Sequence, residues 1–323
     1  MRSRPDGHLA VGSSPGRDRV GEFPVGAPAS SMLPMSVFWT TAELLERGRS
    51  PRQIRRAVEQ QLVAPVRKGH FVTPGADLDV VRAVRTGGVA TATTASRALG
   101  LWTPPDPTPG APAVRAGRAR DRLHVAVPRN AARLRDPDDA AAPFRPSPRV
   151  VLHWVDEAEL VGTGRSRIAH VPLLLRHAFL SLPPEHALAV LDSALHLRFL
   201  RNEDIPVLAA SLPERLRGVV MAADGRADSG TETIVRYRLR ARGLRVEVIV
   251  GLRGIGTVDL LVDGRLIIEC DGREFHDDDE AFERDRARDL HAARQRYRTL
   301  RFTWFMVLFK WPLVEEAVFA ALG

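Results

Sequence analysis

The amino-acid sequence predicts a mixed α/β protein whose ordered part falls into three regions. Two kinds of pattern predict this fold class. Amphipathic stretches that open on serine caps are typical of helices, and short apolar runs bounded by Gly, Pro or Asp are typical of strands. The length of 323 residues, with 44% hydrophobic and 27% charged residues, suits two or three globular domains. We place the domain boundaries at residues 1–34, 35–80, 81–223 and 224–323.

Composition excludes several classes of protein. No apolar run reaches the roughly 18 residues that a membrane span needs, and no apolar segment follows the N-terminal arginines as it would in a secretory signal. Because Cys270 is the single cysteine, intramolecular disulfides and cysteine-based zinc sites are excluded. We therefore expect a cytoplasmic protein without a membrane partner.

Positive charge is concentrated upstream of residue 224. The net charge is +8, and only Lys68 and Lys310 among the 47 basic residues are lysines. Residues 224–323 carry 17 basic and 18 acidic side chains, so the whole basic surplus belongs to the upstream part. Such a surplus favours polyanionic partners.

The first 34 residues are rich in Gly, Pro, Ser and Arg and have no hydrophobic periodicity. We expect them to be a disordered extension. Met32 or Met35 is an alternative start of the chain, in which case this segment would be an artefact of gene prediction.

The next region reads as two helices and a β-hairpin. A helical pattern over Thr41–Arg47 stops at a glycine, and a second helix over Pro51–Gln60 begins with a serine cap, a first-position proline and a capping-box glutamine. Two short strands, Val63–Val66 and His70–Thr73, flank a basic turn. This order predicts a small winged helix-turn-helix.

Basic side chains gather on the second helix and on the turn of the hairpin. In the helix, Ile54, Ala57, Val58 and Gln61 or Leu62 form one face and the arginines the other. The predicted DNA-binding residues here are Arg52, Arg55, Arg56, Arg67 and Lys68. The alternative is that these residues are an ordinary solvated face.

Residues 81–223 read as an α/β middle region. The expected elements are helices over 91–101, 172–182 and 185–199 and strands over 123–127 and 150–155, with a loop over 104–120. The histidines of this region are scattered without metal-ligand spacing, so we expect each to be structural: His124, His153, His170, His177, His186 and His196. We find no catalytic constellation in this region.

The stretches TTAELLERGRSPRQIRRAVEQQLVAPVRKGHFVTPG and TASRALGLW resemble the abortive-infection, AbiEi-type antitoxins of type IV toxin–antitoxin systems. The resemblance spans roughly residues 38–200. It implies DNA binding, often autoregulatory, and a possible cognate toxin as partner.

The C-terminal region has its own pattern of elements, in the order αβββαβα. We expect helices over 229–242, 280–296 and 311–322 and strands over 246–250, 257–262, 265–271 and 299–303. This order predicts a small mixed sheet with helices packed against it.

Acidic residues fall at informative places on these elements. Glu232 lies on the first helix and Asp259 near the start of the second strand, while Glu269 and Asp271 lie two apart on the third and project from one face. A carboxylate within an apolar strand is costly to bury unless it is paired or binds a metal ion. Oxygen ligands favour Mg²⁺, or Mn²⁺, over zinc. Cys270, between the two acids, should point into the core from the opposite face.

The register of the hairpin decides whether the acids meet. A strict two-residue loop at Asp263 and Gly264 would pair Asp259 with Ile268 and turn it away from Glu269. A three-residue loop, or a bulge, would place Asp259 directly opposite Glu269. The metal-site hypothesis therefore predicts a loop of odd length.

The stretches SGTETIVRYRLRARGL, VDLLVDGRLIIECDGREFH and DRARDLHAARQRYRTLRFTW resemble a domain of unknown function related to very-short-patch-repair endonucleases, within the PD-(D/E)XK nuclease superfamily. The resemblance covers about residues 225–320 and implies a restriction-endonuclease-like fold. It implies that Asp259, Glu269 and Asp271 hold the metal ion and that Glu232 orients a metal-bound water. His276 would then be the general acid/base or a phosphate contact. Asp285, Arg286 and Asp289 would brace the site, with Arg286 a possible phosphate contact.

One departure from the superfamily pattern leaves two functions open. Asp271 stands where the superfamily has a lysine, and His276 is the candidate substitute. The first function is a DNA-binding, Mg²⁺-dependent endonuclease. The second is a non-catalytic repressor or antitoxin, which a salt bridge from Arg273 or Arg286 at the acidic site would favour. The oligomeric state stays open.

Overall fold

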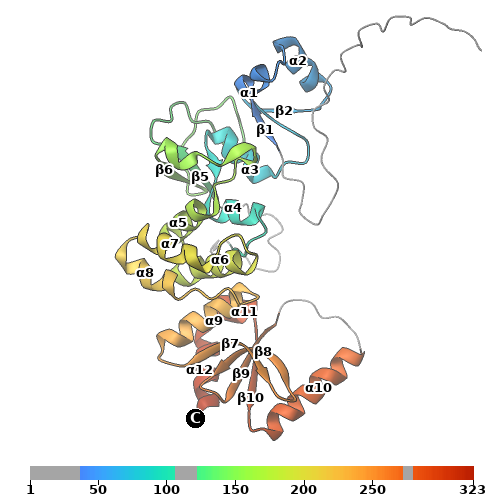
Figure 1. The fold of residues 1–323 in the computed structure, drawn as a ribbon, viewed down its shortest axis with the longest axis vertical. Coiled ribbons are helices and arrows are strands. Elements are labelled where there is room, and N and C mark those ends of the chain that lie inside the picture. The colour runs from blue at the N-terminus through green and yellow to red at the C-terminus, as the bar shows by residue number, and fades with distance from the viewer. Residues whose placement is uncertain (1–36, 106–121, 272–278) are drawn as a thin grey trace, which may run out of the picture. The chain divides into compact units, whose positions relative to one another are not determined.

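The computed structural model describes residues 37–105, 122–271 and 279–323. Within these ranges the chain is a mixed α/β protein, as the sequence predicts, and its strands form three small sheets (Figure 1). No helix in the described ranges is long and apolar enough to cross a membrane.

The first sheet belongs to the arginine-rich N-terminal region, and its strand order is β1-β3-β2. The second helix opens on the predicted capping box of Ser50 and Gln53, and the first opens on a capping box of Thr40 and Glu43 that was not predicted. The elements are β1 (Phe38–Thr40), α1 (Thr41–Glu46), α2 (Pro51–Glu59), β2 (Ala64–Arg67) and β3 (His70–Val72). Strand β1 was not expected; it pairs with β3 and adds a third strand to the hairpin.

The second sheet, in the order β4-β5-β6, lies in the middle region. Strands β5 and β6 are parallel and β4 is antiparallel to β5. The strands are β4 (Val89–Ala90), β5 (Leu123–Pro128) and β6 (Val150–Val155). The helices are α3 (Leu78–Thr86), α4 (Ala92–Ala98), α5 (Val171–Ser181), α6 (Pro184–His196), α7 (Ile205–Ala210) and α8 (Glu214–Met221). Three of these helices, α3, α7 and α8, were not expected from the sequence.

The third sheet, in the order β10-β9-β8-β7, forms the C-terminal region. It matches the expected succession of elements, with one additional short helix before the last. The elements are α9 (Gly230–Ala241), β7 (Val246–Leu252), β8 (Gly256–Val262), β9 (Leu266–Asp271), α10 (Asp279–Arg294), β10 (Arg298–Thr303), α11 (Trp304–Phe309) and α12 (Trp311–Leu322).

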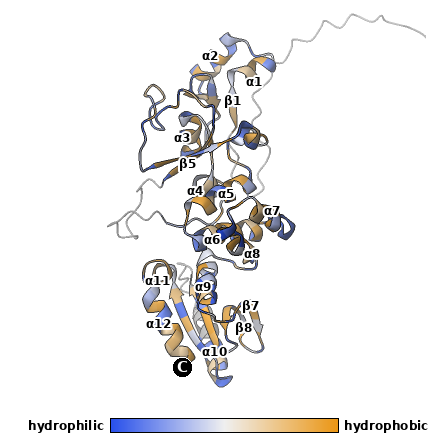
Figure 2. Ribbon diagram, turned by 90° about the vertical axis from the view of Figure 1, so that its left-hand side faces the viewer, coloured by the Kyte–Doolittle hydropathy of each residue, from blue (hydrophilic) through white to orange (hydrophobic). Residues whose placement is uncertain are grey.

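This sheet is apolar on both faces, and its strands include hydrophobic segments in Figure 2. On one face Ile268 packs with Ile234 of α9 and with side chains of α12. On the other face Ile267 packs with Ala292 of α10. Because neighbouring residues of a strand point to opposite faces, this pattern fixes the face of each residue in β9.

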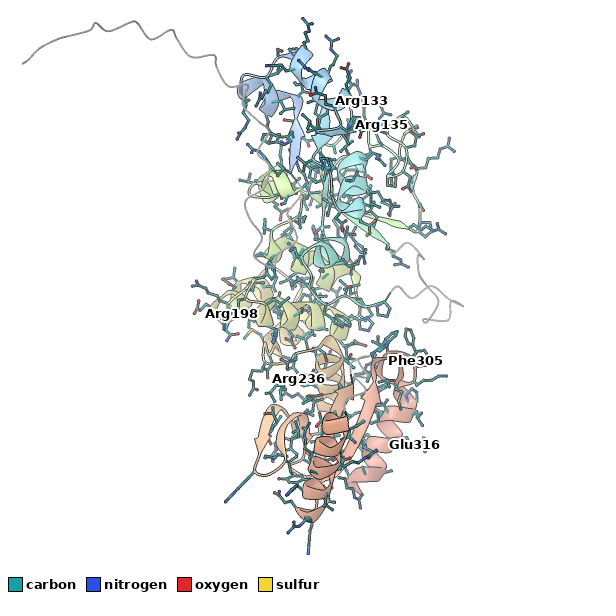
Figure 3. The ribbon with its side chains drawn as sticks, turned by 90° about the vertical axis from the view of Figure 1, so that its right-hand side faces the viewer. Arg133, Arg135, Arg198, Arg236, Phe305 and Glu316 are labelled. Carbon is teal, nitrogen blue, oxygen red and sulfur yellow. The ribbon has the colours of Figure 1, made fainter. Side chains whose placement is uncertain are left out.

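The middle and C-terminal regions share a buried polar contact between α6 and α9. Arg236, which Figure 3 labels on α9, donates from Nη2 to Oδ2 of Asp192 at 2.5 Å, and both side chains are 1% exposed. The same oxygen accepts from the Thr233 hydroxyl at 2.7 Å. These bonds hold the helix that carries Glu232 against the middle region.

Parts of the sequence-based interpretation lie outside the described residues. These are the N-terminal extension, most of the loop expected over 104–120, and residues 272–278 with His276. Within the described chain, the expected position of Gln61 and Leu62 on the apolar face of α2 is wrong. Both are exposed, because α2 ends at Glu59 and Gln61 adopts a left-handed backbone with φ of 57°.

Candidate functional site

The loop between β8 and β9 has three residues, as the metal-site hypothesis requires. Val262 pairs with Leu266, and the Arg265 amide donates to the Val262 carbonyl at 3.1 Å. Asp263 and Gly264 both have positive φ, at 47° and 67°, which the tight reversal needs. The prediction of an odd-length loop is confirmed.

The β8–β9 ladder runs from Val262 with Leu266 to Leu260 with Ile268, and it stops one position before Asp259 and Glu269. There the Asp259 carboxylate accepts a hydrogen bond from the Cys270 amide at 2.8 Å. The Asp259 side chain thus accepts the hydrogen bond that a backbone carbonyl would accept in a regular ladder, and this bond holds Asp259 against β9.

Glu269 projects toward α10. It alternates with Ile268 and Cys270, which pack in the cluster on the α9 face, so the expected orientation of Cys270 toward the core is confirmed. On the α10 face, Nη2 of Arg288 lies 3.3 Å from Oε1 of Glu269. Arg288 also donates to the carbonyls of Ile255 and Thr257, at 3.0 and 2.7 Å. A guanidinium fixed by two backbone bonds therefore neutralises part of the charge of Glu269.

Glu232 is a buried acid in the first turn of α9, 3% exposed. The Ser229 hydroxyl caps this turn, and the Asp228 amide donates to the Glu232 carboxylate at 3.1 Å. Burial, more than the nearby charge of Asp259, raises the pKa of Glu232 to about 7. The side chain therefore exchanges its proton near neutral pH, and its electrostatic link to Asp259 joins it to the acids of the sheet.

The remaining predicted acids divide into two groups. The side chain of Asp271, and residues such as Arg273 and His276, lie outside what the structure describes, as does the side chain of Asp285. Asp289 is described, and Arg301 holds it at 2.7 Å, which lowers the pKa of Asp289. Among the described residues, no three His, Cys, Asp or Glu side chains group closely enough to hold a metal ion.

Arg286 is exposed and lies 3.7 Å from Asp289. The arginine that pairs with Glu269 is therefore Arg288, two residues further along α10 than Arg286, which the sequence had suggested. Arg301 is the parallel-strand neighbour of Glu269, so a second guanidinium also borders this part of the sheet.

The arginine face of α2 is exposed as expected. Arg52, Arg55 and Arg56 are solvent-exposed, while Ile54 and Ala57 on the other side of the helix are buried. The three charges therefore share a solvent-facing side of one helix, available to a polyanion.

The two basic residues at the hairpin turn differ in their exposure to solvent. Lys68 is exposed, but Arg67 is half-buried and donates from Nη2 to the Arg133 carbonyl at 3.3 Å; Figure 3 labels Arg133. Its guanidinium lies where a Cβ on Gly87 would meet it at 2.5 Å. Arg67 thus ties the hairpin to the middle region, a role that the sequence did not indicate.

Two clusters of titratable side chains in the middle region were not predicted from the sequence. Three histidines that show no metal-ligand spacing in the sequence lie together, because the rings of His124, His153 and His177 stack in a row with centroids 5.2 and 4.3 Å apart. A bond of 3.0 Å joins His124 to His153. The useful signal was the placement of His124 and His153 within apolar strands.

The second missed cluster is the Asp192–Arg236 pair. Burial, opposed by Arg236, raises the pKa of Asp192 to about 6. Asp192 sits inside the apolar run ALAVLDSALHL, and the argument that identified Glu269 within an apolar strand applies equally to it.

No protein-family model and no curated protein matches this chain. The site geometry and the resemblances in the sequence are therefore the grounds for a functional proposal.

Proposed function

We propose that the chain is a DNA-binding protein whose C-terminal region is a Mg²⁺-dependent, endonuclease-like domain that hydrolyses phosphodiester bonds. The observation that carries the proposal is the three-residue loop, because its register brings the Asp259 carboxylate to the Cys270 amide, directly beside Glu269 in β9. The electrostatic coupling of Asp259 to the buried Glu232 adds support. The order of these acids also resembles the PD-(D/E)XK nucleases.

The donor set suits a hard divalent cation. Mg²⁺ is typically bound through one or two carboxylates and keeps several waters, so the absence of a three-residue ligand group in the described chain is compatible with it. Asp259 and Glu269 would hold the cation, with Asp271 beside them. When bound, Mg²⁺ or Mn²⁺ would lower the pKa of a water and stabilise charge on the phosphoryl group.

The protein residues would supply the proton transfers and the positioning. Glu232, with a pKa of about 7, is suited to orient the attacking water and to accept its proton on the carboxylate. His276 would act as the acid for the leaving oxygen or contact the phosphate. Arg286, exposed on α10, is the candidate for a further phosphate contact.

DNA would reach this site through the N-terminal region. The order of its two capped helices and its hairpin supports a winged helix-turn-helix, and α2 presents Arg52, Arg55 and Arg56 to solvent. Lys68, exposed at the turn of the hairpin, would contact an adjacent phosphate.

One observation favours a second function, a non-catalytic repressor or antitoxin of a type IV toxin–antitoxin system. Nη2 of Arg288 lies 3.3 Å from Oε1 of Glu269, and hydrogen bonds to the Ile255 and Thr257 carbonyls fix the guanidinium there. A guanidinium in this position can replace a metal ion as the neutralising charge. In that case the nuclease-like domain would bind DNA or a cognate toxin without cleaving.

Plasmid cleavage separates the two functions. Wild type should convert supercoiled plasmid to open circle with Mg²⁺ or Mn²⁺, and Glu269→Gln or Asp259→Asn should lower the rate at least a hundredfold, since each removes a charged metal ligand. Arg215→Gln, an exposed substitution on α8, is the matched control and should cleave as wild type. No cleavage by wild type, with DNA binding retained, would favour the repressor.

DNA binding through α2 has its own test. Changing Arg52, Arg55 and Arg56 together to Gln should weaken binding of any duplex and reduce the slope of log K against log salt by about 3, because each lost phosphate contact removes roughly one released counterion. Fluorescence anisotropy at several salt concentrations measures this slope. A slope equal to that of wild type, with Arg215→Gln as control, would place the DNA elsewhere.

A further inference from the structure

A cavity of about 380 Å³ lies between the middle region and α11, away from the acidic site. Its volume is within the range of small-molecule binding sites. The middle region contributes polar and charged side chains to its wall, and α11 of the C-terminal region contributes an apolar wall.

The charged part of the wall is positive. Arg97 of α4 and Arg122, just before β5, both line the cavity beside His124. Burial, and to a smaller extent the neighbouring His153 and these two arginines, holds the pKa of His124 down at about 3, so the ring is neutral. Arg97 lies 3.7 Å from Asp79, which balances part of its charge. None of the described residues that line the cavity is acidic.

Another part of the wall is apolar. Leu182 and Leu308 line it together with Phe309, which is 44% exposed although it belongs to an aromatic cluster. Its ring centroid lies 5.2 Å from that of Phe305, which Figure 3 labels. A large apolar side chain left partly exposed beside two guanidinium groups is the combination that an amphiphilic anion would fit.

We propose that this cavity binds a small organic anion, a carboxylate or a phosphate monoester carried by an aromatic or aliphatic body. Arg97 and Arg122 bind the anionic group through charge-assisted hydrogen bonds. The Thr93 hydroxyl, on a buried residue of α4, adds a polar contact. Leu182 and Phe309 cover the apolar body. Because these residues come from two regions, the ligand bridges them, whatever the chemistry of the acidic site.

Calorimetric titration of the full chain tests the proposal with three probes. 1-Naphthyl phosphate carries both features of the ligand, inorganic phosphate only the charge, and 1-naphthalenemethanol only the apolar body. We expect one molecule of 1-naphthyl phosphate per chain, bound at least tenfold tighter than either comparator. Octanoate, an aliphatic acid, serves as a second amphiphilic anion. If neither amphiphilic anion saturates a single site, or if inorganic phosphate binds as well as 1-naphthyl phosphate, the proposal is wrong.

Variants locate the binding. Arg122→Gln changes an exposed residue and should weaken the binding of 1-naphthyl phosphate about tenfold to a hundredfold. This is the range expected for loss of a hydrogen bond to a charged group. Phe309→Ala should weaken it about tenfold while leaving inorganic phosphate unchanged. Arg215→Gln on α8 also removes one exposed guanidinium and should bind as wild type. Equal weakening by Arg215→Gln and Arg122→Gln would show a nonspecific charge effect and overturn the site.

Discussion

The middle and the C-terminal regions each bury a cluster of titratable groups, and the two clusters resolve the cost of burial in opposite ways. The histidines of the middle region bond to one another and to the Thr91 hydroxyl, which lies 2.8 Å from His177. They are neutral at pH 7 because burial lowers their pKa values to about 3 for His124, 4 for His153 and 3 for His177.

The acids of the C-terminal region cannot neutralise one another's charge. Glu232 and Asp259 have the same charge when ionised, and their proximity raises the pKa of Glu232 further than burial alone. Glu269 has Arg288 as a counter-ion, whereas among the described residues the Glu232 carboxylate is bonded by the Ser229 hydroxyl and the Asp228 amide. A cluster that needs a proton or a cation is the better candidate for chemistry, and a cluster that is complete when neutral is the better candidate for structure.

Acid should therefore destabilise the protein through the histidine stack, which is the largest effect that we expect. A histidine whose pKa is lowered on folding stabilises the folded chain above pH 6.5, and this contribution is lost as the pH falls toward the folded-state value. Each group contributes about 1.4 kcal/mol per pH unit, so three give about 4 kcal/mol per pH unit between pH 6 and 4. Urea unfolding from pH 7.5 to 4.5, followed by circular dichroism, measures this slope.

The variant His153→Gln isolates the stack from other groups that titrate in the same range. It removes one of the three histidines, so the slope should fall by about 1.4 kcal/mol per pH unit. An unchanged slope would mean that His153 gains its proton as easily in the folded chain as in the unfolded one, and the contrast between the two clusters would fail.

The next effect concerns the buried pair that joins the two regions. Arg236→Ala leaves the Asp192 carboxylate buried without its counter-ion and should cost about 3–5 kcal/mol of unfolding free energy at pH 7.5. Arg226→Ala is the matched control, because Arg226 also forms a short ion pair, 2.7 Å from Asp224, but is 65% exposed. That control should cost about 1 kcal/mol or less. Equal losses in the two variants would show that burial is not the cause.

Local signals in the sequence predicted much of the fold. The helix of Pro51–Glu59 begins at its serine cap, and the helix of Gly230–Ala241 begins at Ser229 and is followed by Gly243 with φ of 83°. Such caps act within one turn, so the sequence displays them directly. Helix α8 escaped because its buried positions, Leu216 and Val220, are too few to give a clear period.

Contacts between distant residues were beyond the reach of local patterns. The three-residue loop between β8 and β9 could be stated in advance as a condition of the metal-site hypothesis, because a hairpin register depends on nearby residues alone. The Arg288–Glu269 bridge depends on how α10 packs on the sheet, and the Asp192–Arg236 pair joins residues of two regions. Neither leaves a periodic trace in the chain.

The smallest of the three effects comes from Glu232 and has the opposite sign to that of the histidines. A carboxyl whose pKa is raised on folding stabilises the folded chain at low pH, and the contribution is lost as the pH rises through the folded-state value. With a pKa of about 7 against 4.5 for the free side chain, the loss reaches about 3 kcal/mol at pH 8 and about 1 kcal/mol at pH 5. Glu232→Gln should thus be more stable than wild type by about 3 kcal/mol at pH 8, measured by urea unfolding in EDTA, and should have lost plasmid cleavage.

Higher stability together with lost cleavage in Glu232→Gln would distinguish a catalytic role from a packing role. A residue kept only for packing would lose stability when changed, whereas a residue kept for chemistry at the expense of stability gains it. Ser229→Ala is the control, since it removes the helix cap beside Glu232 and should cost about 1 kcal/mol at both pH values. If Glu232→Gln were instead destabilised at pH 8 as at pH 5, the carboxylate would have a counter-ion in solution, and the C-terminal acids would resemble the Asp192–Arg236 pair rather than a metal site.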